Sequence, residues 1–348
     1  MRRGLQNDIQ IWKLARDLDL KLKRDPVTEI TEHCVNKIRS FIKDFPCDTL
    51  SELLANAETI LKTRFVEVRT DEELRQIRDL YFKKGETEFA LLEKELGPGV
   101  YAITFRRLCP GKADREFISI IDCRREKAYR SYFSKWHELA HLLTLTDQGR
   151  LKFCRTHAAV KQRDPEEVLM EHIAGEVGFL PDLINRHLTG EISFARIRQL
   201  RDLLCPEASL QSSIIGFVKN WPGPCVLIEA GLGYKKSEER RLAQADLGFL
   251  ERPSPELRVL HVSSNAMAKD VGSLIHQNMR VPQASLIYNV FREANLSEVE
   301  AVEDLNWWET KKEGCLPCHP LRVSARKNGE MLQRLSSQCR ISAVVAPA

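Results

Sequence analysis

The sequence lacks any long hydrophobic run, and this absence argues against a helix that crosses a membrane. Its first residues, Met1 to Asp8, also lack the apolar core of a secretory signal peptide. A charge excess is missing as well, because the formal net charge of +4 over 348 residues gives no independent case for nucleic-acid binding. We therefore expect a cytoplasmic protein with no membrane partner.

The ten cysteines show no disulfide framework. They are spread along a chain without an export signal, so we expect reduced thiols. One cluster, Cys315-Leu316-Pro317-Cys318-His319, matches the spacing of a c-type haem attachment site, but that chemistry requires an exported protein. No second C-x-x-C pair completes a zinc site. We interpret the cluster as a turn, with redox or metal use as the alternative.

The most informative stretch is Trp136-His137-Glu138-Leu139-Ala140-His141, which has the form H-E-x-x-H. Residues four apart lie on one face of a helix, so His137 and His141 can bind one Zn²⁺ ion. Glu138 can then act as general base on a zinc-bound water. Apolar residues surround the motif from 129 to 145, and this pattern predicts a core helix with one polar seam.

A third zinc ligand must come from farther along the chain. The plan H-E-x-x-H-x-x-G-x-x-H would place it at Asp147, but the glycine that makes the sharp turn is missing. The stronger candidates are Glu167 and Glu171, which share one face of a predicted helix. Asp164 is a suitable N-cap for that helix, and Pro165 suits its first position.

Elsewhere the hydrophobic period predicts alternating helices and strands. We expect helices over residues 26–45 and 71–84, and another that Asp48 caps. We expect strands over residues 65–68, 100–105 and 116–122, ahead of the metal-binding helix. Strands that lead into such a helix describe the zincin arrangement, in which an edge strand can hold an extended peptide.

Together these residues resemble the ImmA/IrrE family of zinc metallopeptidases. The resemblance rests on His137 to His141 and on Glu167 to Glu176 followed by Phe179-Leu180-Pro181. It implies that Glu167 is the third zinc ligand. The family's asparagine position is occupied by Glu171 in this sequence, so both acids remain candidates. It also implies a protein substrate, a transcriptional repressor or regulator cut in a stress-response or mobile-element switch.

A further donor should stabilise the oxyanion that forms during peptide hydrolysis. Tyr129, Tyr132 and His157 are the candidates near the motif in the sequence.

Two short amphipathic helices, which Ser193 and Ser209 begin, resemble the family's helix-turn-helix element. Its arginines, at positions 196, 198 and 201, could meet a phosphate backbone, but arginines on an outer helix face are usually solvated. We therefore expect a protein partner, with DNA as the alternative. No oligomeric state is predicted.

The remaining residues predict a mixed α/β domain that loosely resembles the GAF-like domain of IrrE-type members. Expected strands cover residues 225–230, 257–262 and a last one at 321–325, and expected helices lie near 266–277 and 285–291. The pair Trp307-Trp308 could line a small-molecule pocket, although paired aromatics more often pack in a core. The basic run from Arg322 to Arg340 predicts a solvated face.

The predicted fold class is α+β. We expect an N-terminal helical region (1–62), a zincin-like metallopeptidase domain (63–190), a helix-turn-helix-like segment (191–222) and a GAF-like sensory domain (223–348). The expected function is a zinc-dependent endopeptidase. The alternative is a non-catalytic, zinc-containing regulatory or DNA-binding protein.

Overall fold

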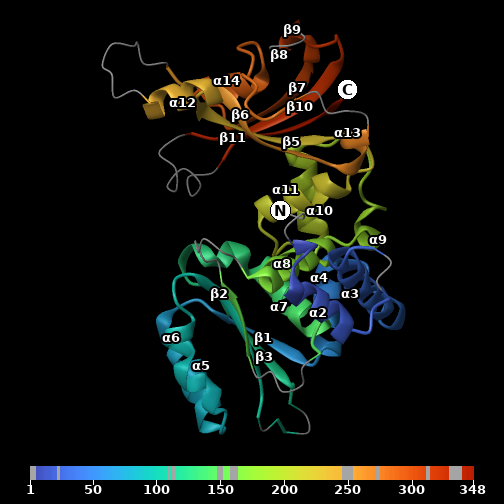
Figure 1. Cartoon of the computed structure of the whole chain (residues 1–348), viewed down its shortest axis with the longest axis vertical. Coiled ribbons are helices and arrows are strands. Elements are labelled where there is room, and N and C mark those ends of the chain that lie inside the picture. Colours follow the sequence, from blue (N-terminus) through green and yellow to red (C-terminus); the bar gives the residue numbers. More distant parts are fainter. Residues whose placement is uncertain are drawn as a thin grey trace. The chain divides into compact units, whose positions relative to one another are not determined.

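The computed structural model describes residues 5–21, 24–108, 110–111, 114–146, 152–156, 164–244, 254–270, 275–310, 314–328 and 339–348. The chain forms two compact units, and each contains a sheet and helices (Figure 1). Unit 1 comprises residues 1–184 and 201–212, and unit 2 comprises residues 185–200 and 213–348. The fold is α+β, as the sequence predicted. No helix in the described part of the chain is both long and apolar enough to cross a membrane.

Unit 1 contains a four-stranded mixed sheet with the order β1-β3-β2-β4. The strands are β1 (Thr63–Val68), β2 (Val100–Arg106), β3 (Phe117–Asp122) and β4 (Lys152–Thr156). Strand β1 is parallel to β3, whereas β2 is antiparallel to both β3 and β4. The first three strands lie within two residues of their predicted bounds. Strand β4 was not predicted, because it is short and contains two basic residues.

Helices cover both faces of this sheet (Figure 1). One face carries α5 (Asp71–Lys83), η1 (Thr87–Leu91) and α6 (Leu92–Glu95). On the other, α7 (Ser131–Leu143) and α4 (Leu50–Ile60) contact the strands, and α2 (Ile9–Asp17), α3 (Pro26–Asp44) and α8 (Pro165–Val177) pack together beside α7. The short helices η2 (Arg125–Arg130) and α9 (Pro181–Ile184) also belong to unit 1. Because side chains alternate along a strand, β2 directs Ile103 and Phe105 into the core beneath α5. Its Thr104 faces α7 and bonds to Glu138 there.

The sequence predicted the N-cap residues of two helices in unit 1, α8 and α4, and the structure confirms one of them. Asp164 caps α8 as predicted, because its side chain accepts a hydrogen bond from the backbone N–H of Glu166. The prediction that Asp48 caps α4 was wrong. Thr49 is the N-cap, and it forms a capping box with Glu52 that satisfies two backbone donors at once.

Asp122, at the end of β3, is a buried carboxylate that binds two cations. Its Oδ1 lies 2.8 Å from Arg124 Nε, and its Oδ2 lies 2.7 Å from Lys127 Nζ. Burial alone would raise the pKa of Asp122, but hydrogen bonds from Arg124 and Lys127 outweigh burial and lower it. These ion pairs therefore stabilise the end of β3 as long as Asp122 is ionised.

We expect Asp122→Asn to cost about 3 kcal/mol of unit 1 stability at pH 7, because it leaves Lys127 without its counter-charge and Arg124 with Asp71 alone. The folded pKa of Asp122 lies below its unfolded value of about 3.9. The stabilisation is therefore complete above about pH 4 and is lost as the pH falls through the folded pKa. Urea unfolding of both proteins at pH 7 and pH 3 measures this. An equal difference at the two pH values would contradict the ion-pair account.

Unit 2 contains a five-stranded antiparallel sheet with the order β6-β5-β11-β10-β7. Its strands are β5 (Val226–Gly233), β6 (Glu256–Ser264), β7 (Glu298–Asp304), β10 (Pro320–Lys327) and β11 (Ile341–Pro347). Strands β8 (Glu309–Thr310) and β9 (Gly314–Cys315) form a small hairpin. The helical elements are α12 (Lys236–Gln244), α13 (Ala266–Asp270), α14 (Leu286–Arg292) and η3 (Leu305–Trp307). Helix α14 packs on β7, β10 and β11.

Three predictions for unit 2 need correction. Residues 321–325 lie in β10 but are not the last strand, because β11 follows. The basic run is not simply a solvated face, since Val323 and Ala325 of β10 are buried. The helix expected near residues 266–277 is α13, which ends at Asp270, and residues 271–274 lie outside the described part of the chain.

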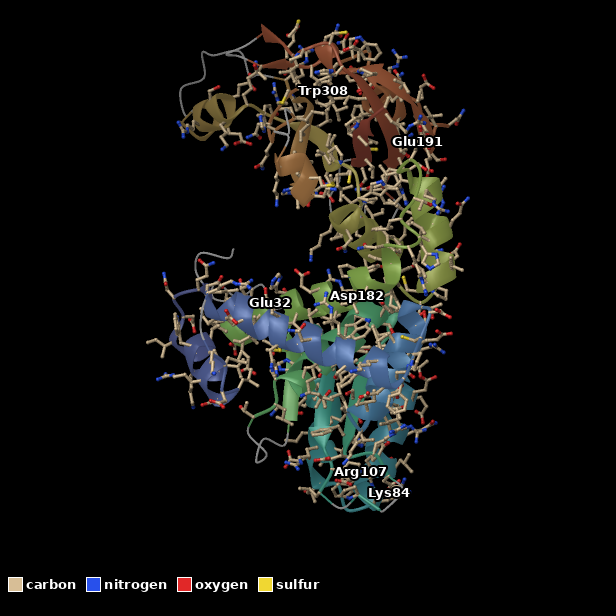
Figure 2. All side chains as sticks on the ribbon, turned by 90° about the vertical axis from the view of Figure 1, so that its right-hand side faces the viewer. Glu32, Lys84, Arg107, Asp182, Glu191 and Trp308 are labelled. Atoms are coloured by element: carbon tan, nitrogen blue, oxygen red, sulfur yellow. The ribbon has the colours of Figure 1, made fainter. Side chains whose placement is uncertain are left out.

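The two adjacent tryptophans of unit 2 have different surroundings. Trp308 is fully buried in the core of the unit (Figure 2), and its Nε1 donates to a carboxylate oxygen of Glu303 at 3.3 Å. Trp307 is 42% exposed. The side chains therefore do not line a common pocket, and Trp308 has a packing role.

We expect Trp308→Ala to cost about 3–5 kcal/mol of unit 2 stability, because it removes the largest apolar side chain of the core and leaves a cavity. Trp307→Ala serves as the matched control and should stay within about 0.5 kcal/mol of the wild type. Urea denaturation followed by far-UV circular dichroism compares them. Similar losses in both variants would contradict this assignment.

Candidate metal centre

Helix α7 carries the H-E-x-x-H motif into the interior of unit 1. His137, Glu138 and His141 are all at most 1% exposed, and α8 packs beside α7. Gly178, which follows α8, allows this close approach. A Cβ atom at Gly178 would lie 3.1 Å from Cδ1 of Trp136 on α7 and 2.8 Å from the carbonyl oxygen of Ala174. Sequence analysis did not identify this glycine.

The structure brings together three of the predicted ligands, His137, His141 and Glu167. Nε2 of His137 lies 3.2 Å from Oε2 of Glu167, and Nε2 of His141 lies 3.2 Å from Oε1 of the same carboxylate. One ligand atom from each residue fits within 4.8 Å of the others. Nitrogen and oxygen ligands of a tetrahedral zinc, each at about 2.0–2.1 Å from the ion, lie about 3.3 Å apart. Each imidazole nitrogen lies at about this distance from a different oxygen of Glu167, so the donor set suits zinc and the three residues are close enough to share one ion.

The ionisation of these groups reflects the same contacts. Burial would lower the pKa of His141, but the neighbouring carboxylates of Glu166 and Glu167 outweigh it and raise the pKa to about 9. Burial would raise the pKa of Glu167, but hydrogen bonds from His137 and His141 outweigh it and lower the pKa to about 2. Without a metal ion these pKa values keep Glu167 ionised and His141 protonated at neutral pH, so metal binding would release a proton from His141.

The other acids considered from the sequence have different places. Glu171 is not a member of the group that the structure assembles from described residues, and Asp147 lies outside them. Glu166, in the first turn of α8, also lies near the site. Its Oε1 is 3.7 Å from Nδ1 of His141, where an outer carboxylate can orient a ligand ring.

Glu138 points towards the sheet beneath α7. Its Oε2 accepts a hydrogen bond of 2.7 Å from the hydroxyl of Thr104 on β2. Thr104 in turn lies 2.6 Å from the hydroxyl of Ser119 on β3. Both hydroxyls are buried, and sequence analysis missed them because single polar residues in apolar strands have no diagnostic spacing.

The predicted oxyanion donors differ in their placement. The buried hydroxyl of Tyr132 donates to the carbonyl oxygen of Gly178 at 2.6 Å, so a structural bond already uses its proton. Tyr129 is 60% exposed. His157 lies outside the described residues.

The cluster at residues 315–319 lies in unit 2 on the surface. Sγ of Cys318 lies 2.8 Å from Oδ2 of Asp304, and this carboxylate raises the pKa of the thiol. Cys315 is exposed and lies 3.8 Å from Glu309. These side chains belong to no group of potential metal ligands among the residues that the structure describes.

The arginines considered for DNA contact all bind groups of the protein. Arg198 makes two hydrogen bonds to Glu298, at 2.6 and 2.8 Å. Arg196 donates to the carbonyl oxygen of His187 at 3.0 Å, and Arg201 pairs with Asp202 at 2.6 Å. These contacts weaken the case for phosphate binding, and DNA binding stays the alternative to a protein partner.

A pocket of about 360 Å³ lies on the face of the unit 1 sheet that carries α5, not on the face of the metal ligands. Its lining includes Lys84 and Arg107 (Figure 2). Buried Arg107 is already neutralised by Glu86 at 2.8 Å and Asp114 at 2.7 Å. The pocket therefore takes no part in the metal chemistry.

Comparisons with known proteins show a likeness to solved structures. No family model and no curated protein matches the chain. A solved structure described as a Mycobacterium tuberculosis transcriptional regulator is similar over 91% of this chain and 76% of that chain, with 9% sequence identity and a TM-score of 0.42.

Proposed function

We propose that unit 1 is a zinc-dependent endopeptidase. The observation that carries this proposal is the group of His137, His141 and Glu167, whose ligand atoms lie within 4.8 Å of one another and are of the types that catalytic zinc sites use. Three protein ligands leave a fourth position for a reactant, which is the arrangement of catalytic zinc sites. Glu138 adjoins a ligand in the sequence and on the helix.

Zinc in this position would polarise the scissile carbonyl and lower the pKa of a neighbouring water. His137, His141 and Glu167 would hold the ion, and Glu166 would orient the ring of His141. Glu138 would accept the proton of the attacking water and return it to the leaving amine. Burial of the site strengthens these electrostatic interactions, because little water competes with them.

We further propose that the substrate is a protein, specifically a transcriptional repressor or regulator in a stress-response or mobile-element switch. The support is the resemblance of residues 137–181 to ImmA/IrrE peptidases. In the same proposal unit 2, with its five-stranded sheet and α14, is a sensory domain that regulates cleavage. This assignment rests on the looser GAF-like resemblance.

A non-catalytic regulator with a structural zinc is the second candidate. The complete burial of Glu138 and its bond to Thr104 favour it, because a carboxylate that only supports the fold would look the same. The test is incubation of the zinc-loaded protein and its Glu138→Gln variant with a mixed-sequence peptide pool, with products identified by mass spectrometry. Cleavage by the wild type alone supports the endopeptidase, and no cleavage by either supports the regulator.

A further inference from the structure

Three buried hydroxyls form a row across the unit 1 sheet and end at Glu138. Thr63 on β1, Ser119 on β3 and Thr104 on β2 are each fully buried. The Oγ atoms of Thr63 and Ser119 are 3.0 Å apart, and those of Ser119 and Thr104 are 2.6 Å apart. The hydroxyl of Thr104 then donates to Oε2 of Glu138 at 2.7 Å. Neighbouring strands thus contribute one hydroxyl each to a continuous row.

The chemistry of the last group fixes the direction of every hydrogen bond in this row. An ionised carboxylate only accepts hydrogen bonds, so Thr104 gives its single proton to Glu138. Thr104 must then accept from Ser119, and Ser119 must accept from Thr63. Each hydroxyl therefore donates towards Glu138, and such a chain polarises its members in the same sense.

The surroundings make this row unusual. Ala102 and Ile121, which lie on the same sheet face, are apolar and buried. A buried hydroxyl carries a desolvation cost that valine in its place would avoid. Three such residues on adjacent strands are all oriented towards one carboxylate. This arrangement indicates that their role is to bind and orient that carboxylate.

We propose that Thr104 is a positioning residue that holds Glu138 for its role as general base. This inference rests on the proposed endopeptidase function. The bond to Thr104 fixes Oε2 and with it the plane of the carboxylate, so that the proton from water goes to Oε1. Ser119 donates to Thr104 and Thr63 donates to Ser119, so both residues affect Glu138 only through Thr104. Their influence decreases with distance from Glu138.

The test compares Thr104→Val, which keeps the shape and removes the hydroxyl, with Thr104→Ser, which keeps the hydroxyl. The full-length, zinc-loaded proteins are assayed on a fluorogenic peptide built around a bond that the wild type cleaves. Thr104→Val should lower kcat by about tenfold to a hundredfold, because a buried acceptor loses its donor. KM should stay within about twofold, and Thr104→Ser should retain most of kcat. Ser119→Ala should lower kcat less than Thr104→Val.

Two measurements do not depend on cleavage. Zinc affinity, measured with zinc alone by chelator competition, should be equal in the wild type and both Thr104 variants. In thermal unfolding, Thr104→Val and Glu138→Ala should be non-additive, because each removes the same hydrogen bond.

The proposal is overturned if Thr104→Val keeps the wild-type kcat, if Thr104→Ser is as impaired as Thr104→Val, or if the unfolding effects add. Failure of the proposed function has a different signature. In that case the zinc-loaded wild type cleaves nothing although unfolding stays non-additive, and Thr104 is reduced to a packing contact of Glu138.

Discussion

Glu138→Gln should abolish nearly all peptide cleavage while the protein keeps its zinc. Glutamine has the size of glutamate and can still accept the hydrogen bond from Thr104, but it cannot take a proton from water. A general base of this kind contributes about 10²–10⁴-fold to the rate. We therefore expect cleavage of the fluorogenic peptide to fall by at least about a hundredfold, with one equivalent of zinc by elemental analysis in both proteins.

The joint measurement of rate and metal is what makes this substitution informative. Loss of cleavage together with loss of zinc would mean that Glu138 acts on the metal site itself and would contradict the assignment as a base. A variant as active as the wild type would leave the regulator as the better account. An unchanged far-UV circular dichroism spectrum is the control for folding.

The second large effect concerns the third ligand. Glu167→Ala should weaken zinc binding by more than about a hundredfold, because removal of a direct ligand must exceed the 10–100-fold effect of an outer-shell partner. It also leaves His137 and His141 without the carboxylate that contacts both of their Nε2 atoms. Competition with a fluorescent zinc chelator measures the affinity.

Glu171→Ala is the matched control, since Glu171 lies one turn farther along α8 and outside the ligand group of described residues. It should bind zinc within about twofold of the wild type. If instead Glu171→Ala loses the metal and Glu167→Ala keeps it, the asparagine position of the family carries the ligand in this chain, and the contacts of Glu167 have another purpose.

The parts of the fold that were predictable have a strong local pattern. Helices α3, α5 and α8 follow from a clear hydrophobic period together with residues such as Asp164 and Pro165 that favour a helix start. Strand β7 (Glu298–Asp304) was missed because four of its seven residues are acidic and only its pairing with β10 makes it a strand. The error at Asp48 arose because two adjacent residues can both cap, and Glu52 decides between them.

The same distinction applies to the candidate site. His137 and His141 are one turn apart on a single helix, so local geometry alone places them together. Glu167 comes from a second helix, and only a family resemblance singled it out from Glu171. Thr104 and Ser119 reach Glu138 through strand pairing and sheet packing, which no spacing in the sequence records.

The interleaving of the two units has a consequence for any shortened version of the protein. Residues 201–212 belong to unit 1, although residues 185–200 before them belong to unit 2. In this segment Leu204 and Cys205 are fully buried, and Glu207 accepts a hydrogen bond of 2.6 Å from the hydroxyl of Ser51. A fragment that stops at residue 190 would keep every ligand of the metal centre yet expose the apolar surface that this returning segment covers. A fragment that ends at the apparent domain boundary would therefore be prone to aggregate, and a fragment that keeps unit 1 intact must extend at least through residue 212.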